Sequence, residues 1–461
     1  MMNVFKKKSV YAAILAGLGA VGAAGTASAV HVNADGLGQV LVYPYYTVRD
    51  GNDTYLSVVN TTASTKAVKV RFLEGKNSRE VLDFNLYLSP FDVWTGAVVA
   101  TTTGAKLVTG DKSCTTPAIP AGGKAFVNYA YSGNATVEDG EDGSLDRTRE
   151  GYFEIIEMGV VTNATHTGYI KHTNGTPANC GALQSLTIAP ITPVGGLAGE
   201  ASLLASALGT DYSYDAVAID DWAAAPQWTA PDSLFPNLGS GGVTTSNVFN
   251  GAAGVVTSTW AFGVDAVSAV LMHNNVINEF MLDTGTLSGT DWVVTAPTKS
   301  LYVSRDTAYT DPRSFDNPFP PFAEAFGVGG SCDPIALTIH DREEATAPVD
   351  FSPLPPGVVS SLCWEANVVT FNQTTAGVSN VLGSINSTNI STDYQNGWLQ
   401  MNLVNDPLVN VLTSLTGGQY FGLPVVGFMV QDYTNNNAAP GVMATYGGNF
   451  NHKTTRSIVG F

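Results

Sequence analysis

The sequence predicts a mainly β protein of antiparallel β-sandwich-like modules, with a few short helices in the middle region. Three observations predict this class. Hydrophobic and polar residues alternate with a period of two in several segments, as they do in strands that bury one face. Clusters of turn-forming residues separate these segments at intervals of about ten residues. Only 13% of the residues are charged and 48 are glycine, which is unlike the composition of a helix-rich cytosolic protein.

The strands nearest the N-terminus carry the clearest pattern. The segments 39–48 and 54–60 are rich in valine, tyrosine and leucine. Residues 68–72 read Val-Lys-Val-Arg-Phe, and residues 82–88 read Leu-Asp-Phe-Asn-Leu-Tyr-Leu. This alternation predicts strands with one buried face and one face in water.

The middle of the chain is predicted to mix strands with helices. A strand is expected at 151–158. Apolar residues recur with helical spacing in 197–208 and are followed by Gly209, so a short helix is expected there. A longer helix is expected at 265–282, where apolar residues again share one stripe.

Strands return in the last third of the chain. Proline-rich breaks at 317–321 and 352–356 interrupt this part as rigid loops or boundaries. The strands are expected at 292–296, 301–303, 335–340, 362–371, 398–404 and 425–433.

Length and composition favour a division into four parts. Residues 1–29 are a signal peptide, and residues 30–140 are an N-terminal β-sandwich-like domain. Residues 141–310 are a mixed β-rich middle region with one or two helices. Residues 311–461 are a C-terminal β-rich region.

The first 29 residues have the organisation of a secretory signal peptide. Lys6–Lys8 form a positive start, residues 9–25 are small and apolar, and Ala27–Ala29 reads as an A-x-A cleavage site. The next most apolar stretch, 255–272, contains Asp265 and is short for a membrane span. We therefore expect export, with no transmembrane helix after signal cleavage.

The charge balance excludes one class of partner. Lys and Arg total 21 and Asp and Glu total 39, so the formal net charge is −18. Nucleic-acid binding depends on basic side chains that neutralise phosphates. The sequence therefore predicts no nucleic-acid partner.

Four cysteines follow the signal peptide, at Cys114, Cys180, Cys332 and Cys363. An even number in an oxidising compartment predicts two disulfides. Four cysteines allow three pairings, and the one between sequence neighbours joins the first to the second and the third to the fourth. The alternative is metal ligation, but no C-x-x-C spacing supports it.

Carboxylates crowd the polar loop 133–149. They are Glu138, Asp139, Glu141, Asp142 and Asp146. Calcium takes about six to eight oxygen ligands from flexible acidic loops, so these residues are candidate calcium ligands. Their spacing differs from that of an EF-hand, and the alternative is a solvated acidic loop. Calcium is the one cofactor that the sequence proposes.

Motifs of catalysis are mostly absent. The sequence has no H-E-x-x-H, no P-loop, no G-x-S-x-G and no haem-attachment motif. The charged run 340–344 holds Asp341 and Glu343, which are candidate acids for a hydrolase, but paired carboxylates alone are not specific. The sequence leans against an enzyme and leaves the question open.

Several stretches together resemble a family of long exported β-rich proteins of Gram-negative bacteria. They are residues 36–49, 68–94, 289–303 and 420–433. The resemblance implies export and one shared architecture over most of the chain. It carries no known activity, so it implies no role for individual residues.

These observations predict an exported, disulfide-stabilised structural or adhesive protein of the cell surface or extracellular matrix, without catalytic activity. Its partner would be a surface or matrix component or further copies of itself, because few charges protect its strand edges. A periplasmic or secreted ligand-binding protein or hydrolase is one alternative. An outer-membrane β-barrel is another: the terminal Phe461 favours it, whereas the cysteines and candidate helices do not.

Overall fold

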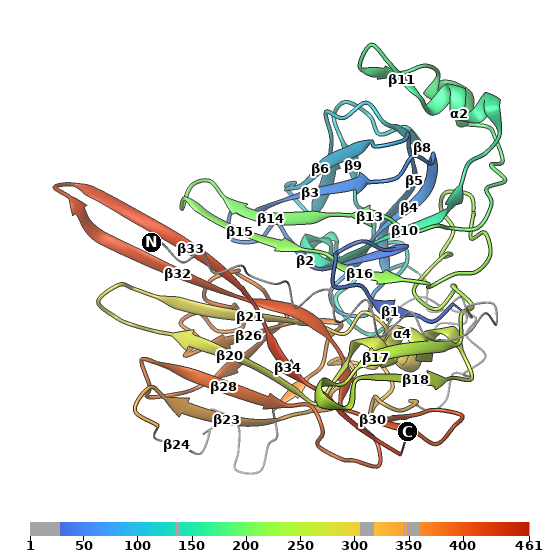
Figure 1. Ribbon diagram of the computed structural model, residues 1–461. Coiled ribbons are helices and arrows are strands. Elements are labelled where there is room, and N and C mark those ends of the chain that lie inside the picture. The colour runs from blue at the N-terminus through green and yellow to red at the C-terminus, as the bar shows by residue number, and fades with distance from the viewer. Residues whose placement is uncertain (1–27, 134–138, 305–317, 345, 348–359, 461) are drawn as a thin grey trace, which may run out of the picture.

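Strands dominate the fold, and four large sheets form its framework (Figure 1). The computed structural model describes residues 28–133, 139–304, 318–344, 346–347 and 360–460. All described strand pairs are antiparallel except one. The prediction of a mainly β, sandwich-like fold is confirmed. Of the predicted signal peptide, only its last two residues belong to the described part.

Two sheets are built from residues up to 220, and we call them sheet A and sheet B. Sheet A has the order β1 (His31–Val32), β16 (Val217–Asp220), β2 (Val40–Thr47), β10 (Glu150–Val160), β4 (Lys66–Glu74), β5 (Glu80–Leu88) and β8 (Cys114–Thr116). Sheet B has the order β15 (Thr210–Asp215), β14 (Glu200–Ala205), β3 (Asp53–Asn60), β6 (Val93–Ala100), β7 (Ala105–Val108) and β9 (Lys124–Ala125), and β13 (Leu197–Ala198) also pairs with β3.

Sheets A and B face each other across an aromatic-rich core. The ring of Phe84 in sheet A lies 5.6 Å from that of Trp94 in sheet B. Within sheet A, Tyr43 stacks on Phe153 with ring centroids 4.1 Å apart. The apolar members of the alternating N-terminal segments supply this core, as the period-two pattern predicts.

The polar residues of β4 and β5 were predicted to lie in water, and this prediction is wrong. Lys69 and Asp83 form an ion pair, and both side chains are almost fully buried. The segment after β16 covers them, since Ala230 and Asp232 bond to this pair through their main chain. The polar residues do share one face, but a loop distant in sequence removes that face from solvent.

Two further sheets, C and D, are built from the C-terminal half. Sheet C has the order β24 (Thr346–Ala347), β23 (Ala336–Asp341), β28 (Asn396–Asn402), β20 (Asn275–Met281) and β34 (Lys453–Thr455). Sheet D has the order β27 (Ser387–Ile390), β26 (Ala366–Phe371), β21 (Gly289–Thr295), β32 (Val426–Ala439) and β33 (Val442–Asn451). The pair β26 and β27 is the parallel exception.

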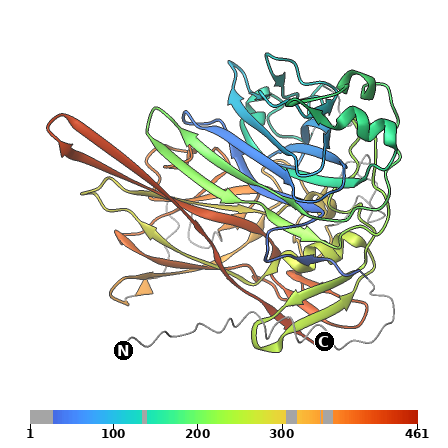
Figure 2. The same ribbon diagram turned by 45° about the horizontal axis from the view of Figure 1, so that its top comes forward.

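Sheet D lies between sheet C and the N-terminal sheets. On one side, Phe371 of sheet D stacks on Phe280 of sheet C at 5.0 Å. On the other, Phe428 stacks on Tyr214 of sheet B at 4.6 Å. The Thr295 hydroxyl donates to the carbonyl of Pro44 over 2.6 Å. The two sandwiches therefore pack directly on each other, as Figure 2 also shows.

Short elements complete the fold. The additional strands are β11 (His172–Thr173), β12 (Thr176–Pro177), β17 (Thr245–Phe249), β18 (Val255–Thr259), β19 (Met272–His273), β22 (Asp333–Pro334), β25 (Ser361–Leu362), β29 (Val411–Thr413), β30 (Gln419–Phe421), β31 (Leu423–Pro424) and β35 (Ser457–Val459). The helices are η1 (Leu145–Arg149), α2 (Ala164–Ile170), α3 (Cys180–Leu183), η2 (Gly251–Ala253), α4 (Gly263–Leu271) and α5 (Ser300–Val303). Within the described ranges, none of the helices has the length and apolar character needed to cross a bilayer.

Three local predictions were wrong. The segment 197–208 contains β13 and β14 and not a helix, because every second residue of β14 is buried, which is the strand period. The helix predicted at 265–282 is α4 followed by β19 and β20, since burial in β20 also alternates. The strand predicted at 301–303 belongs to the short helix α5.

Strand pairing does not follow the predicted boundaries near residues 140 and 310. Sheet A combines strands before residue 140 with β10 and β16. Sheet D pairs β21 with β26 and β32, which lie beyond residue 310. The large sheets instead group residues 31–220 and residues 275–455.

Candidate functional site

The predicted acidic loop ends at η1 and lies against a set of buried cations. Asp139 accepts two hydrogen bonds of 2.9 Å from the guanidinium of Arg147, one on each carboxylate oxygen. The same guanidinium bonds Glu74 and lies 4.1 Å from the ring centre of Tyr131. Burial alone would raise the pKa of Asp139, but the Arg147 contacts hold it below its ordinary value. Asp139 is therefore an ionised partner of an internal arginine.

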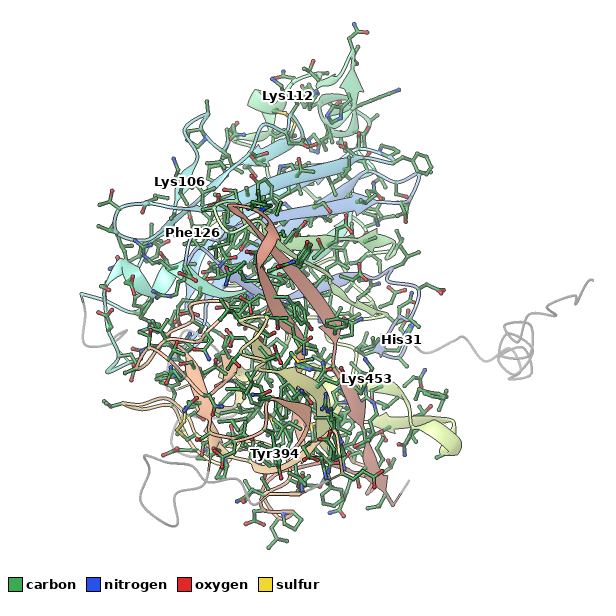
Figure 3. All side chains as sticks on the ribbon, turned by 90° about the vertical axis from the view of Figure 1, so that its left-hand side faces the viewer. His31, Lys106, Lys112, Phe126, Tyr394 and Lys453 are labelled. Carbon is green, nitrogen blue, oxygen red and sulfur yellow. A yellow bond between two sulfur atoms is a disulfide. The ribbon has the colours of Figure 1, made fainter. Side chains whose placement is uncertain are left out.

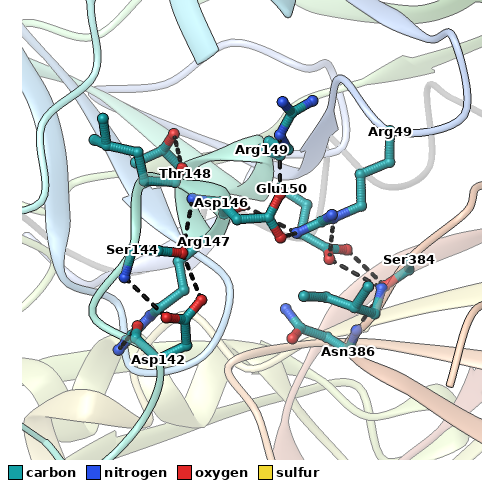
Figure 4. A network of polar contacts seen from close by, with 12 residues as sticks. Arg49, Asp142, Ser144, Asp146, Arg147, Thr148, Arg149, Glu150, Ser384 and Asn386 are labelled. Atoms are coloured by element: carbon teal, nitrogen blue, oxygen red, sulfur yellow. Dashed lines mark hydrogen bonds and ion pairs between the residues drawn. The ribbon is translucent and has the colours of Figure 1, made fainter. Parts of the chain in front are cut away.

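The other described carboxylates of the loop also have partners, and Figure 4 shows those of Asp142 and Asp146. Glu141 forms an ion pair with Lys76 and accepts the N–H of Gly329. Asp142 accepts the N–H and the hydroxyl of Ser144, the residue that caps η1. Asp146 contacts two arginines, at 2.9 Å and 3.0 Å.

Glu150, directly after η1, extends this network to the C-terminal half. Its carboxylate accepts the Nε–H of Arg49 at 2.7 Å and the hydroxyl of Tyr45 at 2.7 Å. It also accepts the hydroxyl of Ser384 at 2.6 Å and the N–H of Ile385 at 3.0 Å. Figure 4 shows Arg49, Glu150 and Ser384 converging from different ribbons. This network fastens the N-terminal sandwich to the segment that precedes β27.

Three of the candidate calcium ligands, Asp139, Glu141 and Asp146, are therefore paired with basic side chains, and Asp142 bonds Ser144. Among the residues that the structure describes, no group of three His, Cys, Asp or Glu side chains could hold a metal ion. Glu138 lies outside the described residues. The calcium site stays a prediction.

The cysteines form two disulfides between sequence neighbours. Cys114 bonds Cys180, which ties α3 to the edge strand β8 of sheet A. Cys332 bonds Cys363 next to the short pair of β22 and β25. Each bridge fixes a peripheral element to the framework.

The two candidate acids of a hydrolase lie at the end of β23. Asp341 accepts the main-chain N–H of Glu343, which in turn pairs with Arg342. The side chains of Arg342 and Glu343 are 71% and 65% exposed. Glu343 is therefore not held in a cleft that would position it for acid–base work, whereas Asp341 is partly buried.

The feature that the sequence reasoning missed is a long hairpin of β32 and β33, which we call the arm. The arm extends beyond the neighbouring strands in Figure 1, and Figure 3 views it from the end of the molecule toward which it points. Among the strands that the structure describes, β33 is the edge of sheet D and pairs only with β32. About halfway along β33, Gly447 lies so close to Tyr212 of β15 that an added Cβ would meet the ring at 2.8 Å.

The exposed side of β33 carries an apolar stripe. Val442, Tyr446 and Phe450 are 49%, 56% and 47% exposed, and their even spacing places them on one face of the strand. Residues 433–451 contain no Asp, Glu, Lys or Arg. The sequence pattern predicted a strand at 425–433. The absence of charged residues from 433 to 451 was a signal that the strand continues and is followed by another.

Comparisons with protein-family models, with curated proteins and with solved structures found no match.

Proposed function

We propose that the chain is an exported structural protein of the cell surface or extracellular matrix that associates with copies of itself through the arm. The observation that carries this proposal is the edge strand β33, which joins an open backbone edge to an apolar stripe and lacks charges. Natural sheets usually protect such edges with charged side chains, proline or bulges. The arm has one register shift, between Asn435 and Ala439, and a proline, Pro440, and both lie near its tip. β33 itself carries no charge and no proline, which supports a role in strand addition.

A second copy is the partner that fits this edge best. Two β33 strands can pair antiparallel about a twofold axis, so that the same surface serves both copies. The chain carries a formal charge of −18, so two copies repel each other over most of their surface. Asp432 is the one carboxylate in the sequence of the arm. Two copies that approach each other along the arm therefore repel each other least.

The arm is also held in place for such a contact. Its middle packs on sheet B through Gly447 and Tyr212. Its inner strand, β32, pairs over seven residues with the buried strand β21. A preorganised edge loses little conformational freedom when a partner strand adds to it.

Export and a passive role are supported by other features. The two disulfides suit an oxidising compartment. The acidic loop, which had the densest carboxylates, is engaged in internal ion pairs. The basic n-region, apolar run and A-x-A site at the N-terminus support secretion.

Sedimentation velocity of the oxidised chain after signal removal tests self-association. We expect a dimer or larger species that dissociates on dilution. Tyr446→Lys places a charge in the middle of the stripe and, in a twofold pair, brings two like charges together. It should weaken association at least about tenfold, which corresponds to roughly 1.4 kcal/mol.

Leu408→Lys is the matched control, because Leu408 is an apolar residue 84% exposed and lies outside the arm. It adds the same charge and should leave association unchanged. A wild-type chain that stays monomeric at every concentration would contradict the proposal, as would equal association of the two variants.

A further inference from the structure

A cavity of about 570 Å³ lies where the C-terminal end of α4 meets the hairpin of β17 and β18, and β34. Its lining residues include Val32, Asn247, Phe249, Val270, His273, Thr454 and Arg456. His31 and Lys453, which precede two of these residues in the chain, are labelled near each other in Figure 3. The cavity uses neither the arm nor the ion-pair network of the acidic loop.

Arg456 is the one ionised residue among those that line this cavity. Its guanidinium donates to the carbonyls of Val270 at 2.7 Å and Met272 at 2.6 Å, and more weakly to Ala269 at 3.5 Å. These bonds cap the end of α4, where a cation is favourable. No carboxylate of the described residues forms an ion pair with it, and burial lowers its pKa to about 10.

The cap leaves part of the guanidinium available. Arginine has five N–H donors, and the bonds to the three carbonyls occupy at most three of them. Arg456 is partly buried and has no counter-ion among the described residues, and an anion that reaches its guanidinium would offset the cost of removing the charge from water. In a chain with a formal charge of −18, a cavity lined by a cation and no carboxylate is an exception.

His273 adds a second polar group to the same wall. Its Nδ1 is buried and has no hydrogen-bond partner among the described residues. Burial, and then the charge of Arg456, lower the pKa of His273 to about 3, so the ring is neutral at neutral pH. A neutral imidazole carries one N–H, and the main chain of Thr455 already forms a hydrogen bond with this ring that favours the N–H. His273 is therefore an uncharged part of the cavity wall, and Arg456 is the group that attracts an anion.

A larger cavity of about 730 Å³ adjoins the first and shares Val32, Val270, His273, Thr454 and Arg456 with it. The larger cavity also has carboxylates in its lining, all on exposed residues: Asp35, Glu200 and Asp215. These carboxylates repel an anion from that side. The part of the wall that belongs to the smaller cavity carries Arg456 and no carboxylate, so an anion is favoured on that side.

We propose that the smaller cavity binds a small organic carboxylate, with its carboxylate on Arg456, beside the neutral ring of His273, and its apolar part against Phe249, Val32 and Val270. The apolar walls distinguish this ligand class from an inorganic anion, which would leave them unused. This assignment does not depend on self-association through the arm.

Isothermal titration calorimetry with octanoate tests the assignment, with octylammonium as the probe of opposite charge. Octanoate should bind and octylammonium should not. Thr454→Asp places a carboxylate on an exposed position of the cavity wall and leaves the α4 cap intact. It should weaken octanoate binding at least about tenfold.

Thr413→Asp is the matched control, because Thr413 is exposed on β29 and does not line the cavity. It should bind octanoate as the wild type does. Phe249→Ala keeps every charge and should weaken octanoate, but not acetate, whose chain is too short to reach that wall. Equal binding of octanoate and octylammonium, or equal affinity of the two aspartate variants, would overturn the assignment.

Discussion

Glu365 offers a prediction about stability and pH that can be worked from the structure. Its side chain is 1% exposed, just before β26 and beside the turn between β4 and β5. Burial raises its pKa to about 8, while the charge of Lys299 and a bond from Ser78 oppose the rise only in part. The carboxyl is therefore protonated in the folded protein at neutral pH and ionised in the unfolded chain.

The sign follows from linkage. The pKa of Glu365 is higher in the folded protein than in the unfolded chain. The free energy of unfolding is therefore highest below about pH 4.5 and falls as the pH rises to about 8. Each pKa unit corresponds to about 1.4 kcal/mol, so this one group lowers the free energy of unfolding by on the order of 5 kcal/mol across that window. Glu365→Gln cannot ionise and should stabilise the protein at about pH 8 by a similar amount.

Urea unfolding of the oxidised protein, followed by tryptophan fluorescence between about pH 5 and about pH 8, measures the effect. The free-energy difference between Glu365→Gln and wild type should grow with pH over this range. Glu343→Gln, on a side chain 65% exposed, is the matched control and should show no such growth. If the difference in unfolding free energy between Glu365→Gln and wild type did not change with pH, the pKa of Glu365 would be the same in the folded and unfolded chain. That result would contradict the prediction.

Three further predictions concern the framework. Arg147→Met leaves the carboxylates of Glu74 and Asp139 buried without their cation and should cost about 3–5 kcal/mol of unfolding free energy in urea, whereas Arg342→Met, in an exposed pair, should not change it. Replacing Cys114 and Cys180 with alanine removes a crosslink between residues 66 apart and should lower the free energy of unfolding by about 4 kcal/mol. Replacing Cys332 and Cys363, which are 31 apart, should lower it slightly less. An unfolding free energy that does not change when reductant is added would contradict this. Asp139, Glu141 and Asp146 are already paired with arginine or lysine side chains, so millimolar calcium should leave the melting temperature unchanged. A melting temperature that rises with calcium would instead support the predicted calcium site.

Local patterns predicted the strands well and their surroundings poorly. The alternation through Lys69 and Asp83 identified two strands correctly, because side-chain direction in a strand depends only on neighbouring residues. It could not show that the segment around Ala230 covers their polar face, since that contact joins residues far apart in sequence. The pairing of β16 with β2 is equally non-local, which is why the sheets cross the expected boundaries.

Ambiguous spacing explains the wrong helices. In 197–208 the apolar positions fit a helical stripe, yet Ala201, Leu203 and Ala205 also alternate as in a strand, and pairing with β3 and β15 decides the outcome. The acidic loop was noticed for its charge. Its arginine partners at Arg49 and Arg147 could not be assigned without the fold, because any of several basic residues could have served.

The central claim, that copies of this chain meet through the arm at the cell surface, is tested most directly by crosslinking on intact native cells. A photo-crosslinking residue at Tyr446 is compared with one at Leu408, which is exposed outside the arm. The account predicts an adduct of two copies from position 446 only, and its removal by protease added to intact cells. Adducts from both positions, none from position 446, or adducts that protease cannot reach would contradict it.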